Sequence, residues 1–179
     1  MKKKNLILIT NGYPYNLGET FLEAELNELC KVFSKVYIIA RNSTLKNARA
    51  VPENVQVLTL KSEMSLIDKL RVLFQFLAHI SYLSTIFVNE IRNVKSIYKI
   101  PLTLSVYGKI FHDMSIALYI EKYLKEVKKE FNLLNSNTLY YSYWLNSATT
   151  ALALFKKEKQ TKCVSRAHGS DIYFEQSSF

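Results

Sequence analysis

Residues 163–173, with the sequence CVSRAHGSDIY, place several chemically capable side chains close together. Arg166, which is suited to binding phosphate, comes two positions before His168, whose imidazole titrates near neutral pH. Gly169 follows directly, and the Asp171 carboxylate is near enough to orient the imidazole. Because this cluster ends an apolar run, we expect a strand to deliver it into a cleft, with His168 as the catalytic residue. His168 and Asp171 alone make a poor metal site, so no metal is predicted.

A lone histidine also has a structural interpretation. In that alternative the His168 ring is buried, bonds to the backbone and takes no part in chemistry. Its position at the end of a strand favours the functional interpretation.

The loop at residues 11–20, NGYPYNLGET, follows another apolar run. Gly12 and Gly18 would let backbone amides approach an anion closely. Thr20 and Glu23 have the spacing of a capping box, which predicts that a helix begins there. The spacing of a dinucleotide-binding fingerprint is absent, so the loop alone does not identify a ligand.

A third loop, residues 143–146, carries Trp144, the one tryptophan of the chain. At the carboxyl end of a strand its ring can stack on a sugar or an apolar chain. Packing in the core is the equally acceptable alternative.

Apolar runs alternate with helical patterns along the chain. The runs predicted to be strands are residues 6–10, 36–40, 55–60, 139–143 and 162–167. Helical spacing begins at Leu22 and again at Ile116, after a connector around Pro101 and Gly108, and a shorter helix is predicted at about 147–156. We therefore predict one α/β domain over residues 1–179, with a Rossmann-like, doubly wound, mostly parallel sheet and helices on both faces.

The net charge of +9 calls for an anionic partner or surface. Nucleic acid is not expected, because the basic residues are scattered and form no recognised binding signature. An anionic membrane surface fits better, since the apolar and aromatic segment 72–91 follows Lys69 and Arg71. That segment is too interrupted by polar residues to span a membrane, and a helix packed in the core is its alternative. Charges on the helix around 121–129 are interpreted as a solvated face.

The apolar run at residues 6–9 is too short for a signal peptide, so we expect a cytoplasmic protein, with peripheral binding at the inner face of the cell membrane. Cys30 and Cys163 lie far apart without metal-type spacing and are predicted to be two buried thiols.

In their order along the chain, NGYPYNLGETFLEAEL, YSYWLN and VSRAHGSDIY resemble the N-terminal half of a GT-B-fold glycosyltransferase of the family 4 type. The resemblance implies two Rossmann-like domains facing each other across a cleft. The N-terminal domain holds the saccharide or lipid-linked saccharide acceptor, and the C-terminal domain holds the nucleotide-sugar donor. The implied reaction transfers a sugar to the acceptor in bacterial surface polysaccharide synthesis, with retention of anomeric configuration and without a further cofactor.

The resemblance also implies roles for individual residues. Gly12 and Gly18 would lie near the donor phosphates or the transferred sugar, and His168 would face the reacting sugar. Tyr143 and Trp144 would border the acceptor. The complete set of expected substrate-binding residues is Gly12, Tyr13, Gly18, Glu19, Tyr143, Trp144, Arg166, Gly169 and Asp171.

A complete enzyme of this type is roughly twice as long as this chain, in keeping with two domains. We therefore expect an isolated domain that lacks the donor-binding half, transfers no sugar alone and self-associates through its uncovered edge. The alternative is a non-catalytic partner domain that supplies an acceptor-binding or membrane-binding surface to a separate donor-binding subunit.

Overall fold

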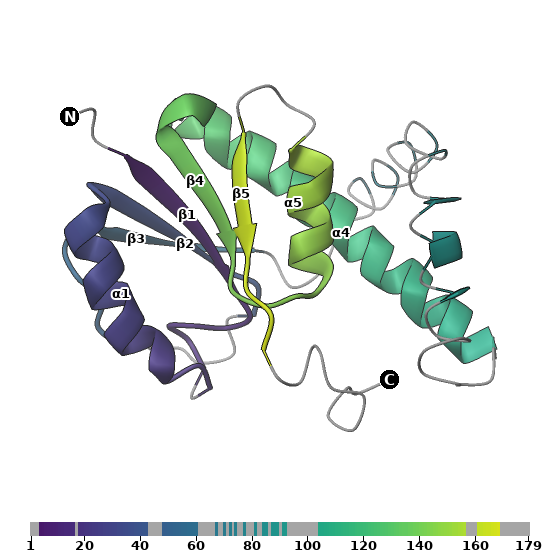
Figure 1. The fold of residues 1–179 in the computed structure, drawn as a ribbon, viewed down its shortest axis with the longest axis horizontal. Helices are drawn as coiled ribbons and strands as arrows, with labels where there is room; N and C mark the ends of the chain where they lie inside the picture. The colour runs from purple at the N-terminus through teal and green to yellow at the C-terminus, as the bar shows by residue number, and fades with distance from the viewer. Residues whose placement is uncertain are drawn as a thin grey trace.

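The computed structural model describes residues 4–16, 18–42, 48–60, 104–156 and 161–168, together with separate positions between 67 and 92. Within this part of the chain, one sheet is formed by the strands β1 (Asn5–Thr10), β2 (Lys35–Ala40), β3 (Val55–Thr59), β4 (Thr138–Ser142) and β5 (Lys162–Ser165). The strand order is β3-β2-β1-β4-β5, and each neighbouring pair is parallel (Figure 1). The predicted Rossmann-like α/β fold is confirmed.

Helices cover both faces of the sheet (Figure 1). Leu6 and Leu8 of β1 pack in the same apolar cluster as Leu22 and Leu26 of α1 (Phe21–Val32). The alternate β1 residues belong to the opposite cluster, which also contains residues of α4 (Leu104–Glu130) and α5 (Ser147–Phe155). Side chains alternate between the two faces of a strand, so a strand buried on both faces has an unbroken apolar sequence. A short 3₁₀ turn, η1 (Asn135–Asn137), leads into β4.

The predicted connector at Gly108 is wrong, because α4 already begins at Leu104. A glycine inside a helix costs only about 1 kcal/mol relative to alanine. Ile110 and Met114, two and six positions after Gly108, are buried, and this apolar face stabilises the helix around the glycine. Pro101 lies outside the described residues.

The predicted solvated face of α4 is wrong at Glu121, which is only 3% exposed. Its carboxylate is paired with the ammonium group of Lys125 on the next turn. Because α4 packs against both the sheet and α5, its buried stripe is wider than a single row of apolar residues. Glu126 and Lys129 on the far side are exposed, as predicted.

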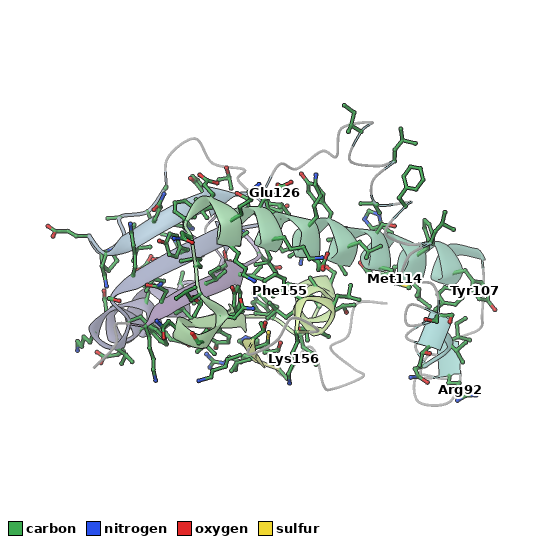
Figure 2. All side chains as sticks on the ribbon, turned by 90° about the horizontal axis from the view of Figure 1, so that it is seen from above. Arg92, Tyr107, Met114, Glu126, Phe155 and Lys156 are labelled. Carbon is green, nitrogen blue, oxygen red and sulfur yellow. The ribbon has the colours of Figure 1, made fainter. Side chains whose placement is uncertain are left out.

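The amino-terminal part of α4 extends past the sheet (Figures 1 and 2). Tyr107 lies there with its ring centre 6.1 Å from that of Phe87. The segment that contains Phe87 has two kinds of described positions: Val72 is buried in the core, whereas Phe74 and Leu77 are exposed. Other positions of segment 72–91, predicted to be a helix at a membrane surface or in the core, lie outside the described residues. Among the described residues, no helix combines the length and the apolar content needed to cross a membrane.

Both cysteine thiols are free. The prediction that they are buried is only partly right, because Cys30 and Cys163 are each half-buried. Burial raises the pKa of the Cys163 thiol to about 11.

Candidate functional site

The carboxylate of Glu19 holds the loop between β1 and α1 together through hydrogen bonds. It accepts hydrogen bonds from the backbone amides of Asn11 at 3.1 Å, Gly12 at 2.9 Å and Tyr13 at 2.8 Å. Glu19 has a φ of 57°, a left-handed conformation that costs a non-glycine residue about 1 kcal/mol. Charge-assisted hydrogen bonds to three amides offset that cost. Three successive amides around one carboxylate make the kind of anion-binding concavity, or nest, that proteins use for phosphate.

Trp144 joins this loop to the loop after β4. Its indole Nε1–H donates a hydrogen bond to the Glu19 carboxylate, so Glu19 is held by donors from two strand ends. The carboxylate is almost completely enclosed, since Glu19 is only 7% exposed. The predicted substrate residues Glu19 and Trp144 therefore bind each other directly.

Gly12 lies in close contact with a side chain of the same loop. A Cβ atom at this position would collide with the side-chain amide of Asn16. The Gly12 carbonyl also accepts hydrogen bonds from the amides of Tyr15 and Asn16, which closes the loop on itself. The loop glycine predicted from the sequence thus serves the packing of the loop.

Arg49, which sequence reasoning missed, holds the other side of the loop. Its Nη2 donates to the carbonyls of Asn16 at 2.8 Å and Gly18 at 2.7 Å. Its guanidinium lies 4.6 Å from the centre of the Tyr13 ring, a cation–π contact. No local pattern marks Arg49, because its partners are about thirty positions earlier in the chain.

The predicted capping box of Thr20 and Glu23 is wrong. Thr20 has helical dihedral angles, φ −60° and ψ −31°, and its side chain makes no capping hydrogen bond. The Glu23 carboxylate instead pairs with Arg49 Nη1 at 2.6 Å. The motif predicted the start of α1 correctly to within one residue. The Glu23 carboxylate pairs with Arg49, which is distant in the sequence, and does not cap the helix.

Three polar side chains connect the carboxyl ends of β2, β1 and β4. The Oδ1 atom of Asn11 accepts from Arg41 Nη1 at 3.3 Å and from Asn146 Nδ2 at 3.1 Å. Asn146 also caps α5, since its Oδ1 accepts from the Ala148 amide at 2.9 Å. The chain places β2 and β3 on one side of β1, and β4 and β5 on the other. The topological switch point therefore lies between β1 and β4, and these three residues surround it.

Arg41 and Asn11 were missed, although both directly follow an apolar strand, and that position was the available signal. Burial lowers the pKa of the Arg41 guanidinium, and the nearby carboxylates of Asp113 and Glu19 oppose this shift.

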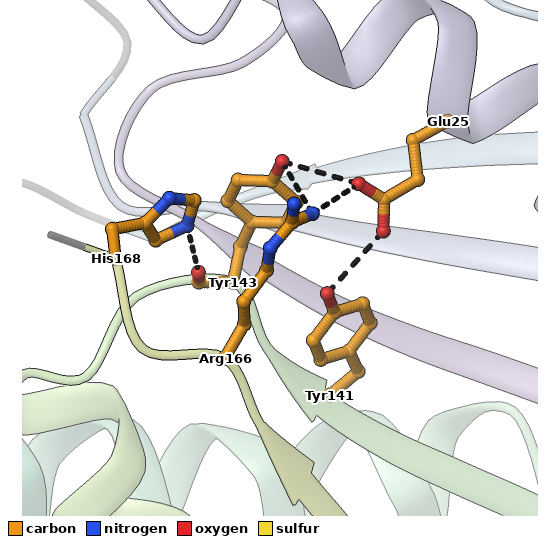
Figure 3. A network of polar contacts seen from close by, with 5 residues as sticks. All are labelled: Glu25, Tyr141, Tyr143, Arg166 and His168. Carbon is orange, nitrogen blue, oxygen red and sulfur yellow. Dashed lines mark hydrogen bonds and ion pairs between the residues drawn. The ribbon is translucent and has the colours of Figure 1, made fainter.

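Arg166 belongs to a polar network shown in Figure 3. Its Nη1 lies 2.6 Å from the Glu25 carboxylate and 2.9 Å from the Tyr143 hydroxyl. The Glu25 carboxylate also accepts hydrogen bonds from the hydroxyls of Tyr143 at 3.1 Å and Tyr141 at 3.3 Å. Burial raises the pKa of Tyr143, and the Glu25 carboxylate raises it further. The guanidinium predicted to meet phosphate is thus paired with a carboxylate of the chain.

His168 lies against the aromatic side of the same cluster. Its ring centre is 4.1 Å from that of Trp144, with the planes 33° apart, and 5.9 Å from that of Phe21. Its Nε2 is 2.9 Å from the Tyr143 carbonyl (Figure 3). Because a carbonyl only accepts, this nitrogen carries the proton. The backbone bond agrees with the structural interpretation of His168, while the ring's place beside Trp144 keeps it in the predicted cluster.

Most predicted site residues therefore lie together at the edge of the sheet that is formed by the carboxyl ends of its strands. The predicted residues that make contacts in this region are Gly12, Tyr13, Gly18, Glu19, Tyr143, Trp144, Arg166 and His168. Gly169 and Asp171 lie outside the described residues. Over the described part of the chain, no group of three or more His, Cys, Asp or Glu side chains could hold a metal ion.

No family model, curated protein or solved structure matches this chain. A functional proposal therefore depends on the sequence motifs and on the geometry of this edge.

Proposed function

We propose that the chain is the acceptor-side domain of a two-domain glycosyltransferase that acts in surface polysaccharide synthesis. One observation supports this most: three motifs that are distant in the sequence meet at one edge of the sheet. Glu19 from the first motif bonds to Trp144 from the second, and the Trp144 ring lies against the His168 ring from the third. Open parallel sheets bind their ligands at this edge.

The side chains at the edge suit a saccharide. The half-buried Trp144 and the 48%-exposed Phe21 are aromatic side chains of the kind that pack against the apolar side of a sugar ring. The neighbouring polar side chains provide hydrogen-bond partners for hydroxyl groups. Convergent polar groups beside apolar surface are typical of small-molecule sites.

In the proposed reaction, the acceptor hydroxyl oxygen forms a bond to the anomeric carbon while the bond from that carbon to the nucleoside diphosphate breaks. The hydroxyl proton leaves with the diphosphate. Because the diphosphate donor would be bound by a second domain, this domain supplies the acceptor and His168, which contacts the transferred sugar. The Tyr143 carbonyl fixes the orientation of the ring for that contact.

Titration calorimetry with the 179-residue chain tests which ligand class the domain takes. We expect binding to at least one member of a panel of methyl glycosides and none to UDP-glucose. Trp144→Ala should abolish this binding, whereas Leu134→Ala, at an exposed position before β4, should leave it unchanged. Binding of UDP-glucose in preference to every glycoside, or the absence of both, would reject the acceptor-side proposal.

A second candidate function is a membrane-binding or partner-binding domain. The described positions Ile67, Leu70, Phe74 and Leu77 are helical, and their side chains are 62%, 53%, 69% and 56% exposed. Their spacing places them along one side of a helix, where apolar residues are not expected to face water without a use. The net charge of +9 favours an anionic surface as the partner.

Sedimentation with phosphatidylserine vesicles and with neutral phosphatidylcholine vesicles tests this candidate. The chain should bind the anionic vesicles and be released as salt screens the charges. Phe74→Asp should weaken binding, whereas Val32→Asp, at a 70%-exposed position at the end of α1, should not. Equal binding to both kinds of vesicle, or to neither, would reject it.

A further inference from the structure

The amide nest at the carboxyl end of β1 already contains an anion. The amides of Asn11, Gly12 and Tyr13 all donate to the Glu19 carboxylate at 2.8–3.1 Å. A fourth donor, the Trp144 indole, bonds to the same carboxylate. In many α/β proteins, donors after the first strand bind the phosphate of a ligand.

We propose that Glu19 is a built-in anion that fills this nest, so that the edge excludes phosphate and takes a neutral, hydroxyl-bearing ligand. The exclusion of phosphate depends only on the contacts of Glu19. The choice of a saccharide as the neutral ligand rests on the proposed function.

A phosphate could reach these amides only by displacing Glu19. The displaced carboxylate would be left in an enclosed position without its four donors, and burying an unpaired charge is expensive. If Glu19 stayed in place, its charge would repel the incoming phosphate, because like charges at short range in a partly buried site interact strongly.

The arginines of this edge give an independent argument. Arg49 is paired with Glu23, and Arg166 is paired with Glu25. Arg41 lies in the field of Glu19 and Asp113.

Two of these three guanidinium groups are thus paired with a carboxylate of the chain itself, and carboxylates lie near the third, although the whole chain has a net charge of +9. A site built for phosphate would keep excess positive charge, so this balance favours an uncharged ligand.

Nuclear magnetic resonance of the ¹⁵N-labelled 179-residue chain tests the proposal. Inorganic phosphate and pyrophosphate are titrated separately while the amides of Asn11, Gly12 and Tyr13 and the Trp144 indole are followed. We expect no saturable shift in the wild-type chain at millimolar concentrations. A saturable shift centred on these amides would overturn the proposal.

Two variants then open the nest. Glu19→Ala removes the carboxylate, and Glu19→Gly removes it while keeping the left-handed φ of 57° accessible without a steric cost. Phosphate should bind either variant roughly tenfold or more tightly than it binds wild type, because the amides are released. Glu28→Ala makes the same change of charge on α1 at an exposed position and should gain no phosphate binding.

A folded Glu19→Gly chain that gains no phosphate binding would also overturn the proposal. If both Glu19 variants fail to fold, the wild-type titration still decides the result. Failure of every glycoside to bind, with phosphate still excluded, would reject the proposed function and leave the assignment of Glu19 intact.

Discussion

The indole N–H of Trp144 donates a hydrogen bond to the carboxylate of Glu19, a residue 125 positions earlier in the chain. This bond links the loops that follow β1 and β4, the two strands at the switch point of the sheet. The same carboxylate orders three amides of the first loop. The conformations of the two loops therefore depend on one another through Glu19, in addition to the hydrogen bond between Asn146 and Asn11.

Glu19→Ala should lower the free energy of unfolding by about 2–4 kcal/mol, because it leaves several enclosed donors without an acceptor. Glu19→Gly should recover about 1 kcal/mol of this loss, since glycine adopts a positive φ freely. Urea denaturation at neutral pH measures both values. Glu28→Ala is the control and should change stability by less than about 0.5 kcal/mol. Equal stability of the Glu19→Ala and Glu28→Ala chains would contradict the role given to Glu19.

The same substitution at two glycines should have opposite effects. Gly12→Ala should cost about 1–3 kcal/mol, because the new methyl group collides with the Asn16 side chain. Gly108→Ala should stabilise the chain by up to about 1 kcal/mol, because a Cβ there meets no atom within 4 Å and alanine favours a helix. Thermal and urea unfolding of the two variants measure the difference, and Asn16→Ala in the Gly12→Ala background should restore part of the loss. A destabilising Gly108→Ala would show that α4 does not pass regularly through this position.

The raised pKa of Tyr143 predicts that the folded chain loses stability at high pH. The folded-state pKa of Tyr143 is raised above the unfolded value of about 10, so the unfolded chain releases this proton first as pH rises. The neutral phenol therefore stabilises the folded chain fully below about pH 10. Above pH 10 the free energy of unfolding falls, by up to about 1.4 kcal/mol per pH unit. Tyr143→Phe should therefore flatten the decline of stability above pH 10. Urea denaturation from pH 7 to pH 11 tests this, with each variant compared with its own value at pH 7. Parallel curves for the two chains would contradict the assignment.

His168 should have separable effects on stability and on ligand binding. His168→Ala removes one hydrogen bond from a half-buried ring and should cost about 1 kcal/mol of stability. In calorimetry it should also weaken glycoside binding roughly tenfold, because the His168 ring lies against Trp144, where the acceptor would bind. His168→Gln keeps an N–H donor for the Tyr143 carbonyl, so it should restore stability but not binding. A His168→Ala chain with lowered stability and unchanged binding would favour the purely structural interpretation.

The positions of the strands along the chain and most helix positions could be predicted from the sequence, because a strand that is buried on both faces has an unbroken apolar sequence. Residues 6–9 and 36–40 are apolar without interruption, and the structure places them in adjacent strands, β1 and β2. The connector predicted at Gly108 was wrong, because the residue type alone does not show the tertiary packing that stabilises α4 around this glycine.

The candidate site could be located but not assembled. His168 and Trp144 were recognised from their place after an apolar run, and Glu19 was expected from the resemblance of its loop. The sequence could not show that Glu19 fills the nest or that Glu25 pairs with Arg166, because those partners are set by tertiary contacts. Predicted ligand-binding groups thus bind other groups of the same chain.

The proposed function places a saccharide against Trp144 at the switch-point edge of this sheet. Because Trp144 is the one tryptophan, its indole N–H gives a single, unambiguous cross-peak in the ¹⁵N spectrum of the labelled chain. We expect the methyl glycoside that binds in calorimetry to shift this cross-peak saturably, together with the backbone amide of His168. The exposed α1 residues Glu28 and Lys31 should stay unshifted. A saturable glycoside response that leaves the Trp144 indole unmoved would contradict the proposed function.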